Sequence, residues 1–256
     1  MAEKIIQSVD RALTIFELFE EHTKELSVKE MSNSLSLSKS TIHGLLKTLE
    51  LRGYLSQNPD NQKYRLGLKH FELGNLVAKQ MDLKQIAYTV IQELAERIKE
   101  TIHLVILDGK EAVYIEKVDG PGALRMYSQV GKRVPMYCTG VGKAILAFLE
   151  EEQIRSILNT TSYTKFTQYT LTDPDEIYNQ LIQVRENGYA MDDEEIELGL
   201  LCIAAPIFNH DNKVVASISC AGPKFRFENE QLEDRICKIK HAAVKISQQL
   251  GWNKPD

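Results

Sequence analysis

The feature that most constrains the fold of this chain is a helical stripe of aliphatic residues within "SLSKSTIHGLLKTLELRGYL", residues 36–55. The stripe consists of Ile42, Leu45, Leu46 and Leu49. Their spacing predicts an amphipathic helix, with Ser38 as its N-cap and Gly53 as its stop signal. Such a stripe is stable in water only when neighbouring elements bury it.

The side of this helix opposite the stripe carries short polar groups. Around the helix axis it is made up of Ser40, His43, Gly44 and Lys47, with Lys39 and Thr41 in the first turn. Small donors and acceptors together with lysines suit the major groove of DNA, where they reach base edges and phosphates. Gly44 costs the helix about 1 kcal/mol relative to alanine, which favours close approach of the backbone to a partner. An ordinary solvated helix face is the alternative interpretation.

Two shorter helices are expected before this one. The apolar face of the first consists of Val9, Ala12, Leu13, Phe16 and Phe19. Ser27 and Glu30 have the spacing of a capping box, which predicts the start of the second helix. The apolar side of that helix consists of Val28, Met31 and Leu35.

A short hairpin is expected after the striped helix. Residues 54–57 and 62–66 predict two strands around the turn 58–61, and Lys63 and Arg65 place positive charge on one face of the second strand. Two short helices, a striped third helix and a basic hairpin are typical of a winged helix-turn-helix. In that fold the third helix enters the major groove and the hairpin contacts the backbone or the minor groove.

The distribution of charge supports a contact with DNA. Residues 36–70 carry six basic and two acidic side chains, net +4, in a chain whose net charge is −5. A single basic segment in an acidic protein favours localised binding to double-stranded DNA. A winged helix that binds protein is the alternative, but it leaves this charge unexplained. The expected DNA-binding residues are Ser38, Lys39, Ser40, Thr41, His43, Lys47, Lys63, Tyr64 and Arg65.

Residues 35–74, "LSLSKSTIHGLLKTLELRGYLSQNPDNQKYRLGLKHFELG", resemble the DNA-binding half of the IclR family of bacterial transcription regulators. The resemblance continues in "GKRVPMYCTGVGKAILA" (131–147), "ENGYAMDDEEIELGLLCIAAPIF" (186–208) and "VVASISCAGP" (214–223). The family often has arginine at the position of Gly44 and proline at that of Ser38. These two departures concern the operator sequence and leave the docking mode unchanged.

The second half of the chain alternates helical and strand-like patterns, which predicts an α/β (α+β) domain with a mostly antiparallel sheet flanked by helices. The resemblance implies a GAF-like sensor fold for it and a helical linker before it. We therefore expect a winged helix-turn-helix DNA-binding domain at 1–70, a linker helix at 71–82 and an effector-binding domain at 83–254. The expected helices are 83–98, 140–149, 151–158, 174–187 and 232–250, and the expected strands are 103–107, 112–118, 124–130, 201–208 and 214–221.

The stretch 139–142, "TGVG", precedes a predicted helix, and free N–H groups at a helix start favour a carboxylate, so an organic acid is the expected ligand. Tyr137 and Ala144 replace the glycine and the Ser or Thr that a phosphate-binding P-loop requires. The resemblance implies that the effector contacts are Gly140, Val141, Asp192, Cys202, Ser219 and Ala221. Ala221 departs from relatives that carry serine. Simpler interpretations remain: a plain strand residue for Ser219, core filling for Cys202 and a solvated acidic loop for Asp192.

No metal site or cofactor is expected, because the four cysteines, Cys138, Cys202, Cys220 and Cys237, form no CxxC pair and read as buried, reduced thiols. No apolar run suggests a signal peptide or a membrane span, so we expect a cytoplasmic protein. The resemblance implies a non-enzymatic regulator, more often a repressor, that binds a palindromic operator as a homodimer or homotetramer. A cysteine-dependent enzyme with Cys202 as nucleophile is the alternative, although its apolar neighbours disfavour the thiolate.

Overall fold

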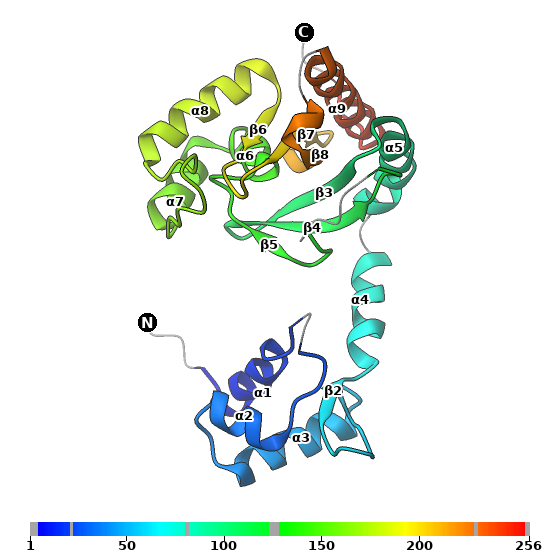
Figure 1. Ribbon diagram of the computed structural model, residues 1–256, viewed down its shortest axis with the longest axis vertical. Coiled ribbons are helices and arrows are strands. Elements are labelled where there is room, and N and C mark those ends of the chain that lie inside the picture. The colour runs from blue at the N-terminus through cyan, green and yellow to red at the C-terminus, as the bar shows by residue number, and fades with distance from the viewer. Residues whose placement is uncertain (1–4, 21–22, 80–81, 123–127, 228–229, 254–256) are drawn as a thin grey trace. The chain divides into compact units, whose positions relative to one another are not determined.

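The computed structural model describes residues 5–20, 23–79, 82–122, 128–227 and 230–253 (Figure 1). By their internal contacts the residues divide into unit 1, Met1–Met81, and unit 2, Asp82–Asp256. The finer division at residues 70 and 82 stays a prediction. None of the described helices combines the length and hydropathy that a membrane span requires.

Unit 1 has the winged helix-turn-helix order that the sequence predicts. Its elements are α1 (Gln7–Glu17), α2 (Val28–Ser34), α3 (Lys39–Leu51), β1 (Leu55–Gln57), β2 (Tyr64–Leu66) and α4 (Lys69–Lys79). Both halves of the capping box at Ser27 and Glu30 are present at the start of α2. Ser38 Oγ accepts the Thr41 N–H at 3.2 Å, and Gly53 follows α3 with φ +76°. The N-caps and the stop signal are therefore confirmed.

The core of unit 1 contains residues that the sequence pattern missed. Its fully or nearly buried members are Ile15, Met31, Ile42, Leu46, Leu55 and Tyr64. The expected face of α1 was partly wrong, because Val9 and Leu13 are 53% and 55% exposed whereas Ile15 is buried. The stripe on α1 is wider than one contact surface, and packing against α2 and α3 selects the side centred on Ile15.

The start of α4 is tied closely to the rest of unit 1. A Cβ added to Gly67 would lie 2.1 Å from the carbonyl oxygen of Gly53, so the two backbones touch where any side chain would clash. The His70 ring packs edge-on against Phe16 and Tyr54, with centroids 4.7 and 5.5 Å apart. The first turn of α4 is therefore fixed on the helix-turn-helix.

Unit 2 is built on one six-stranded sheet of order β5-β4-β3-β8-β7-β6 in which all neighbours are antiparallel, as predicted. Its strands are β3 (Thr101–Asp108), β4 (Glu111–Val118), β5 (Arg133–Val134), β6 (Ala190–Asp193), β7 (Leu200–Phe208) and β8 (Val214–Pro223). Its helices are α5 (Asp82–Ile98), α6 (Gly140–Leu146), α7 (Glu151–Thr160), α8 (Pro174–Asn187) and α9 (Glu230–Gln249), with a 3-10 turn at Lys224–Phe227.

Helices cover both faces of this sheet. On one face α5 and α9 lie side by side and pack on β3, β7 and β8 (Figure 1). On the other face α6 packs on the same central strands, and Ser217 Oγ donates to the carbonyl of Val141 at 3.0 Å. Because side chains alternate along a strand, Ser219 and Cys202 share the α6 face while Cys220 and Ile203 face α5 and α9.

Several expected elements differ in detail. The helix from Gly140 ends at Leu146, and the short strands β5 and β6 were not predicted because two to four residues are too few for an alternating pattern. Most of the strand predicted at 124–130 lies outside the described residues, and Ser128–Val130 is not a strand. Cys138, Cys202 and Cys220 are buried as expected, but Cys237 of α9 is exposed.

Candidate functional site

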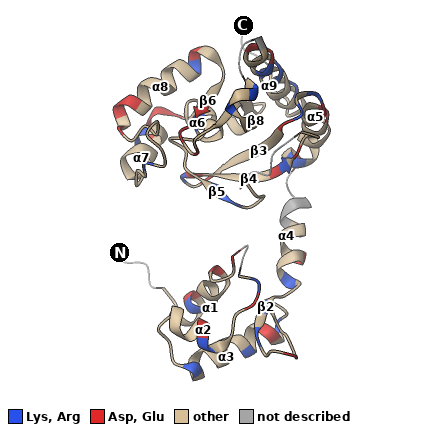
Figure 2. Cartoon of the chain, in the orientation of Figure 1, with Lys and Arg blue, Asp and Glu red and all other residues tan. Residues whose placement is uncertain are grey.

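The outer surface of α3 is open and polar. Lys39, Ser40, Thr41, His43, Gly44 and Lys47 are all exposed, and lysines lie along this helix (Figure 2). The Lys47 side chain is 73% exposed, and its Nζ lies 3.7 Å from Glu50 Oε2. Apart from Gly44's own neighbours and the nearby backbone of α3, no described atom lies within 4 Å of a Cβ built on Gly44, so the helix backbone is uncovered at that point. This surface can contact an extended polar partner.

Ser38 has a different role from the other polar residues of α3. Its Oγ accepts the Thr41 N–H and lies 2.9 Å from the hydroxyls of both Ser40 and Thr41. Ser38 therefore orders the first turn of the helix, and its hydroxyl is already engaged. Its effect on a partner acts mainly through the placement of Ser40 and Thr41.

Of the three hairpin residues expected to bind DNA, two reach the surface and one is buried. Lys63 and Arg65 reach the surface, and Lys63 Nζ lies 3.6 Å from Glu30 Oε1. Tyr64 is only 2% exposed, because its strand position points into the core of unit 1. The prediction of Tyr64 as a DNA contact is therefore wrong, and its ring belongs to the core.

In unit 2, the residues expected to bind an effector come together beside α6. Register pairs Asp192 with Cys202, and Cys202 with Ala221, across β6, β7 and β8. A Cβ added to Gly140 would lie 3.1 Å from Cys202 Sγ and 3.4 Å from the Asp192 nitrogen, so α6 begins directly on these strands. All six expected residues, Gly140, Val141, Asp192, Cys202, Ser219 and Ala221, are buried.

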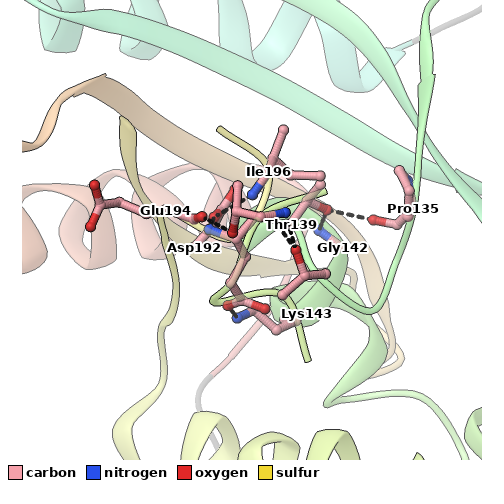
Figure 3. Close-up of polar contacts among 10 residues, drawn as sticks. Pro135, Thr139, Gly142, Lys143, Asp192, Glu194 and Ile196 are labelled. Atoms are coloured by element: carbon pink, nitrogen blue, oxygen red, sulfur yellow. Dashed lines mark hydrogen bonds and ion pairs between the residues drawn. The ribbon is translucent and has the colours of Figure 1, made fainter. Parts of the chain in front are cut away.

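Asp192 is buried and held by backbone donors, so the solvated-loop interpretation is wrong for this residue. It is 3% exposed, and its Oδ1 accepts the N–H groups of Glu195 at 2.8 Å and Ile196 at 3.3 Å (Figure 3). Burial raises the pKa of Asp192 to about 7, although Lys143 and these backbone donors oppose the shift. The carboxyl group is therefore poised to exchange a proton near neutral pH.

A buried ion pair supports this cluster. The fully buried Lys143 Nζ donates to Glu195 Oε1, and Glu195 Oε2 has no partner in the described part of the chain. Sequence reasoning missed both residues. A lysine inside the apolar run "GVGKAILA" was the available signal, since a buried lysine requires an anionic partner.

We predict that the charge of Asp192 makes unit 2 less stable as pH rises. The folded-state pKa of about 7 lies above the ordinary value of 3.8, so folding takes up a proton between these two pH values. The stabilisation is fully present below about pH 4, falls as pH rises and is lost once pH has passed about 7. Asp192→Asn keeps the Oδ1 acceptor and lacks this loss. The difference in free energy of unfolding between Asp192→Asn and wild type should therefore be roughly 2 kcal/mol more in favour of the variant at about pH 8 than at about pH 5. Urea denaturation measures this difference. A constant difference across that range would contradict the assignment.

His103 is a further polar residue on this face that the sequence did not single out. Its Nδ1 lies 3.4 Å from Ser219 Oγ and its Nε2 lies 2.7 Å from Ser128 Oγ. Burial lowers the pKa of His103 to about 3 and raises that of Cys202 to about 12. Both shifts oppose a thiolate–imidazolium pair, so the geometry disfavours the cysteine-enzyme alternative.

Comparison with known proteins identifies both halves of the chain. Residues 8–59 match the model described as IclR helix-turn-helix domain, and residues 75–248 match that described as Bacterial transcriptional regulator IclR C-terminal. The HTH-type transcriptional regulator XynR of Escherichia coli (strain K12) is 43% identical over 97% of this chain and 98% of its own length.

Solved structures show the same architecture. The Thermotoga maritima IclR structure superposes with a TM-score of 0.82 at 32% identity, covering 96% of this chain and 99% of that one. An IclR homolog from Microbacterium hydrocarbonoxydans, complexed with 4-hydroxybenzoate, has a TM-score of 0.84 at 24% identity over 95% and 98% of the two chains. The family models and the relative that matches along almost the whole length agree, so this chain belongs to the IclR family of transcription regulators.

Proposed function

We propose that this DNA-binding regulator is a repressor that binds a palindromic operator in cytoplasmic double-stranded DNA and that a small organic acid bound in unit 2 modulates this binding. The main observation that supports DNA binding is the exposed face of α3. On this face lysines flank short hydroxyl groups, and the helix backbone is uncovered at Gly44. Such a face suits a helix that lies in the major groove.

The residues of this surface take different parts in the proposed complex. Lys39, Lys47, Lys63 and Arg65 bind phosphates, which supplies affinity without sequence selectivity. Ser40, Thr41 and His43 reach base edges from the first two turns of α3. Lys47 and Lys63 must exchange their contacts with Glu50 and Glu30 for phosphates.

The proposed assembly is a homodimer or homotetramer, which matches a palindromic operator by symmetry. An exposed apolar patch in unit 1 supports self-association. It consists of Ile5, Ile6, Val9 and Leu13, each between 53% and 71% exposed. Contiguous aliphatic side chains of this kind are typical of a surface that a second copy covers.

The proposed effector site is the cluster beside the start of α6. Gly140 and Val141 provide backbone donors, Ser219 provides a hydroxyl, and Cys202 and Ala221 provide small apolar walls. The remaining oxygen of Asp192, Oδ2, accepts no hydrogen bond within the described part of the chain and is available to a hydroxyl group. The homolog with 4-hydroxybenzoate carries a carboxylic acid, which supports an acid as the effector class.

A thermal-shift screen of small carboxylic acids tests the proposal that unit 2 binds an organic acid. We expect at least one sugar acid, keto acid or aromatic acid to raise the melting temperature and to change operator affinity in a gel-shift assay. Asp192→Asn and Ser219→Ala should lose most of this response, while DNA affinity without acid stays within about twofold of wild type. Equal thermal shifts in wild type and both variants would show that the acid binds elsewhere.

A further inference from the structure

One carboxylate outside the hairpin holds the turn between its strands. We define the wing as β1, β2 and the turn of residues 58–63 between them. Asn58 Nδ2 donates to Glu25 Oε1 at 3.0 Å, and Asn61 Nδ2 donates to Glu25 Oε2 at 2.7 Å. Each oxygen of Glu25 thus binds one side of the wing tip, from a position more than 30 residues earlier in the chain.

The two asparagines connect Glu25 to the backbone of the turn. Asn58 Oδ1 accepts the Asp60 N–H at 3.0 Å, and Asn61 Oδ1 accepts the Lys63 N–H at 2.9 Å. In each asparagine, the side-chain oxygen therefore accepts a hydrogen bond from the backbone of the turn, and the side-chain nitrogen donates one to Glu25. A ribbon of two three-residue strands is marginal by itself, so these outside contacts have a large share in fixing its shape.

Glu25 is in turn fixed to the helical part of unit 1. The next residue, Leu26, pairs with Tyr64 on the free edge of β2 through hydrogen bonds of 2.9 and 2.8 Å. Ser27 follows as the N-cap of α2. The hydrogen bonds from Asn61 and Asn58 lower the pKa of Glu25, which keeps it an acceptor at neutral pH.

We propose that Glu25 is a positioning residue for DNA binding, which holds the wing so that Lys63 and Arg65 meet the phosphate backbone. This proposal rests on the DNA contact proposed above. Electrostatics alone predicts that neutralising Glu25 would strengthen DNA binding, because Glu25 places a negative charge close to both basic side chains. A positioning role predicts that the same change would weaken binding. The effect of neutralising Glu25 therefore separates a positioning role from a simple charge effect.

Glu25→Gln tests the proposal with little change in size. A glutamine can accept from one asparagine, but its amide nitrogen faces the second Asn nitrogen, donor against donor. Asp60→Asn is the matched control, since it removes the same charge from the tip itself while the backbone N–H of residue 60 still binds Asn58. The probe is a labelled random-sequence duplex of about 30 base pairs, because phosphate contacts need no specific sequence.

Affinity is measured by fluorescence anisotropy across salt concentrations, with thermal melts to verify folding. We expect Glu25→Gln to weaken binding about three- to tenfold and to make the negative slope of log affinity against log salt shallower by about 1. Asp60→Asn should bind as tightly as wild type or more tightly. In an Asn58→Ala, Asn61→Ala background, Glu25→Gln should have no further effect on the slope. Binding by Glu25→Gln as tight as that of Asp60→Asn overturns the positioning role. Absence of wild-type binding even at low salt instead overturns the proposed DNA surface.

Discussion

Replacement of Lys47 and Arg65 by glutamate should weaken binding to a DNA fragment from upstream of the gene by at least about a hundredfold. Each change removes a phosphate contact and adds a repulsive charge from α3 or the wing. The negative slope of log affinity against log salt should become shallower by about 2, because about two fewer counterions are released. Filter binding or anisotropy at several salt concentrations measures both quantities.

A matched control variant has the same change in net charge, but its two substitutions lie in unit 2. Lys165 and Lys213 are exposed lysines of that unit, and replacing both with glutamate changes the charge of the chain by the same amount. This control should retain most of the wild-type affinity. The DNA surface assigned to α3 and the wing is wrong if both double variants lose affinity equally, or if Lys47→Glu/Arg65→Glu binds normally while folded.

Lys143→Met should destabilise unit 2 by about 3 to 5 kcal/mol, the usual effect of removing one partner of a buried ion pair. The ammonium group is fully buried against Glu195, and methionine fills a similar volume without charge. Glu195 and Asp192 would then be two buried carboxyl groups without a cation. Their pKa values, already raised by burial, should rise further, so the loss of stability should be smaller at acidic pH than at neutral pH.

Two comparisons isolate the buried charge. The double variant Lys143→Met/Glu195→Gln should regain much of the lost stability, because it removes the uncompensated carboxylate as well. Lys165→Met, at an exposed lysine, should change the free energy of unfolding by less than about 0.5 kcal/mol. Urea denaturation monitored by circular dichroism measures all of these. A single Lys143→Met variant as stable as wild type would mean that the pair contributes nothing.

Local signals in the sequence predicted local structure well. Ser27 and Ser38 cap helices, and Gly53 follows α3 with φ +76°, because caps and stops depend on groups a few residues apart. The leucine stripe of α3 likewise predicted which side is exposed. The family resemblance, together with these elements, was sufficient for the architecture of both units.

Burial of individual side chains was harder to predict. Asp192 stands in an acidic run and reads as solvated, but pairing of β6 with β7 takes it inside, while Asp193 and Glu194 remain at the surface and bind Lys224. Tyr64 lies between two exposed basic residues yet fills the core of unit 1. Such burial depends on tertiary contacts with residues distant in the sequence, and local sequence patterns do not reveal these contacts.

The contact between Gly53 and Gly67 determines what α4 can transmit. The end of α3 and the start of α4 meet backbone to backbone, and the His70 ring packs on Phe16 beside them. The backbones of residues 53 and 54 also hydrogen-bond those of residues 67 and 69, so a rotation of the first turn of α4 should carry the end of α3 with it. A tilt that begins at the first turn of α4 would therefore change how α3 meets the groove in the proposed complex, and a side chain at position 67, whose Cβ would overlap the carbonyl of Gly53, should disturb this coupling.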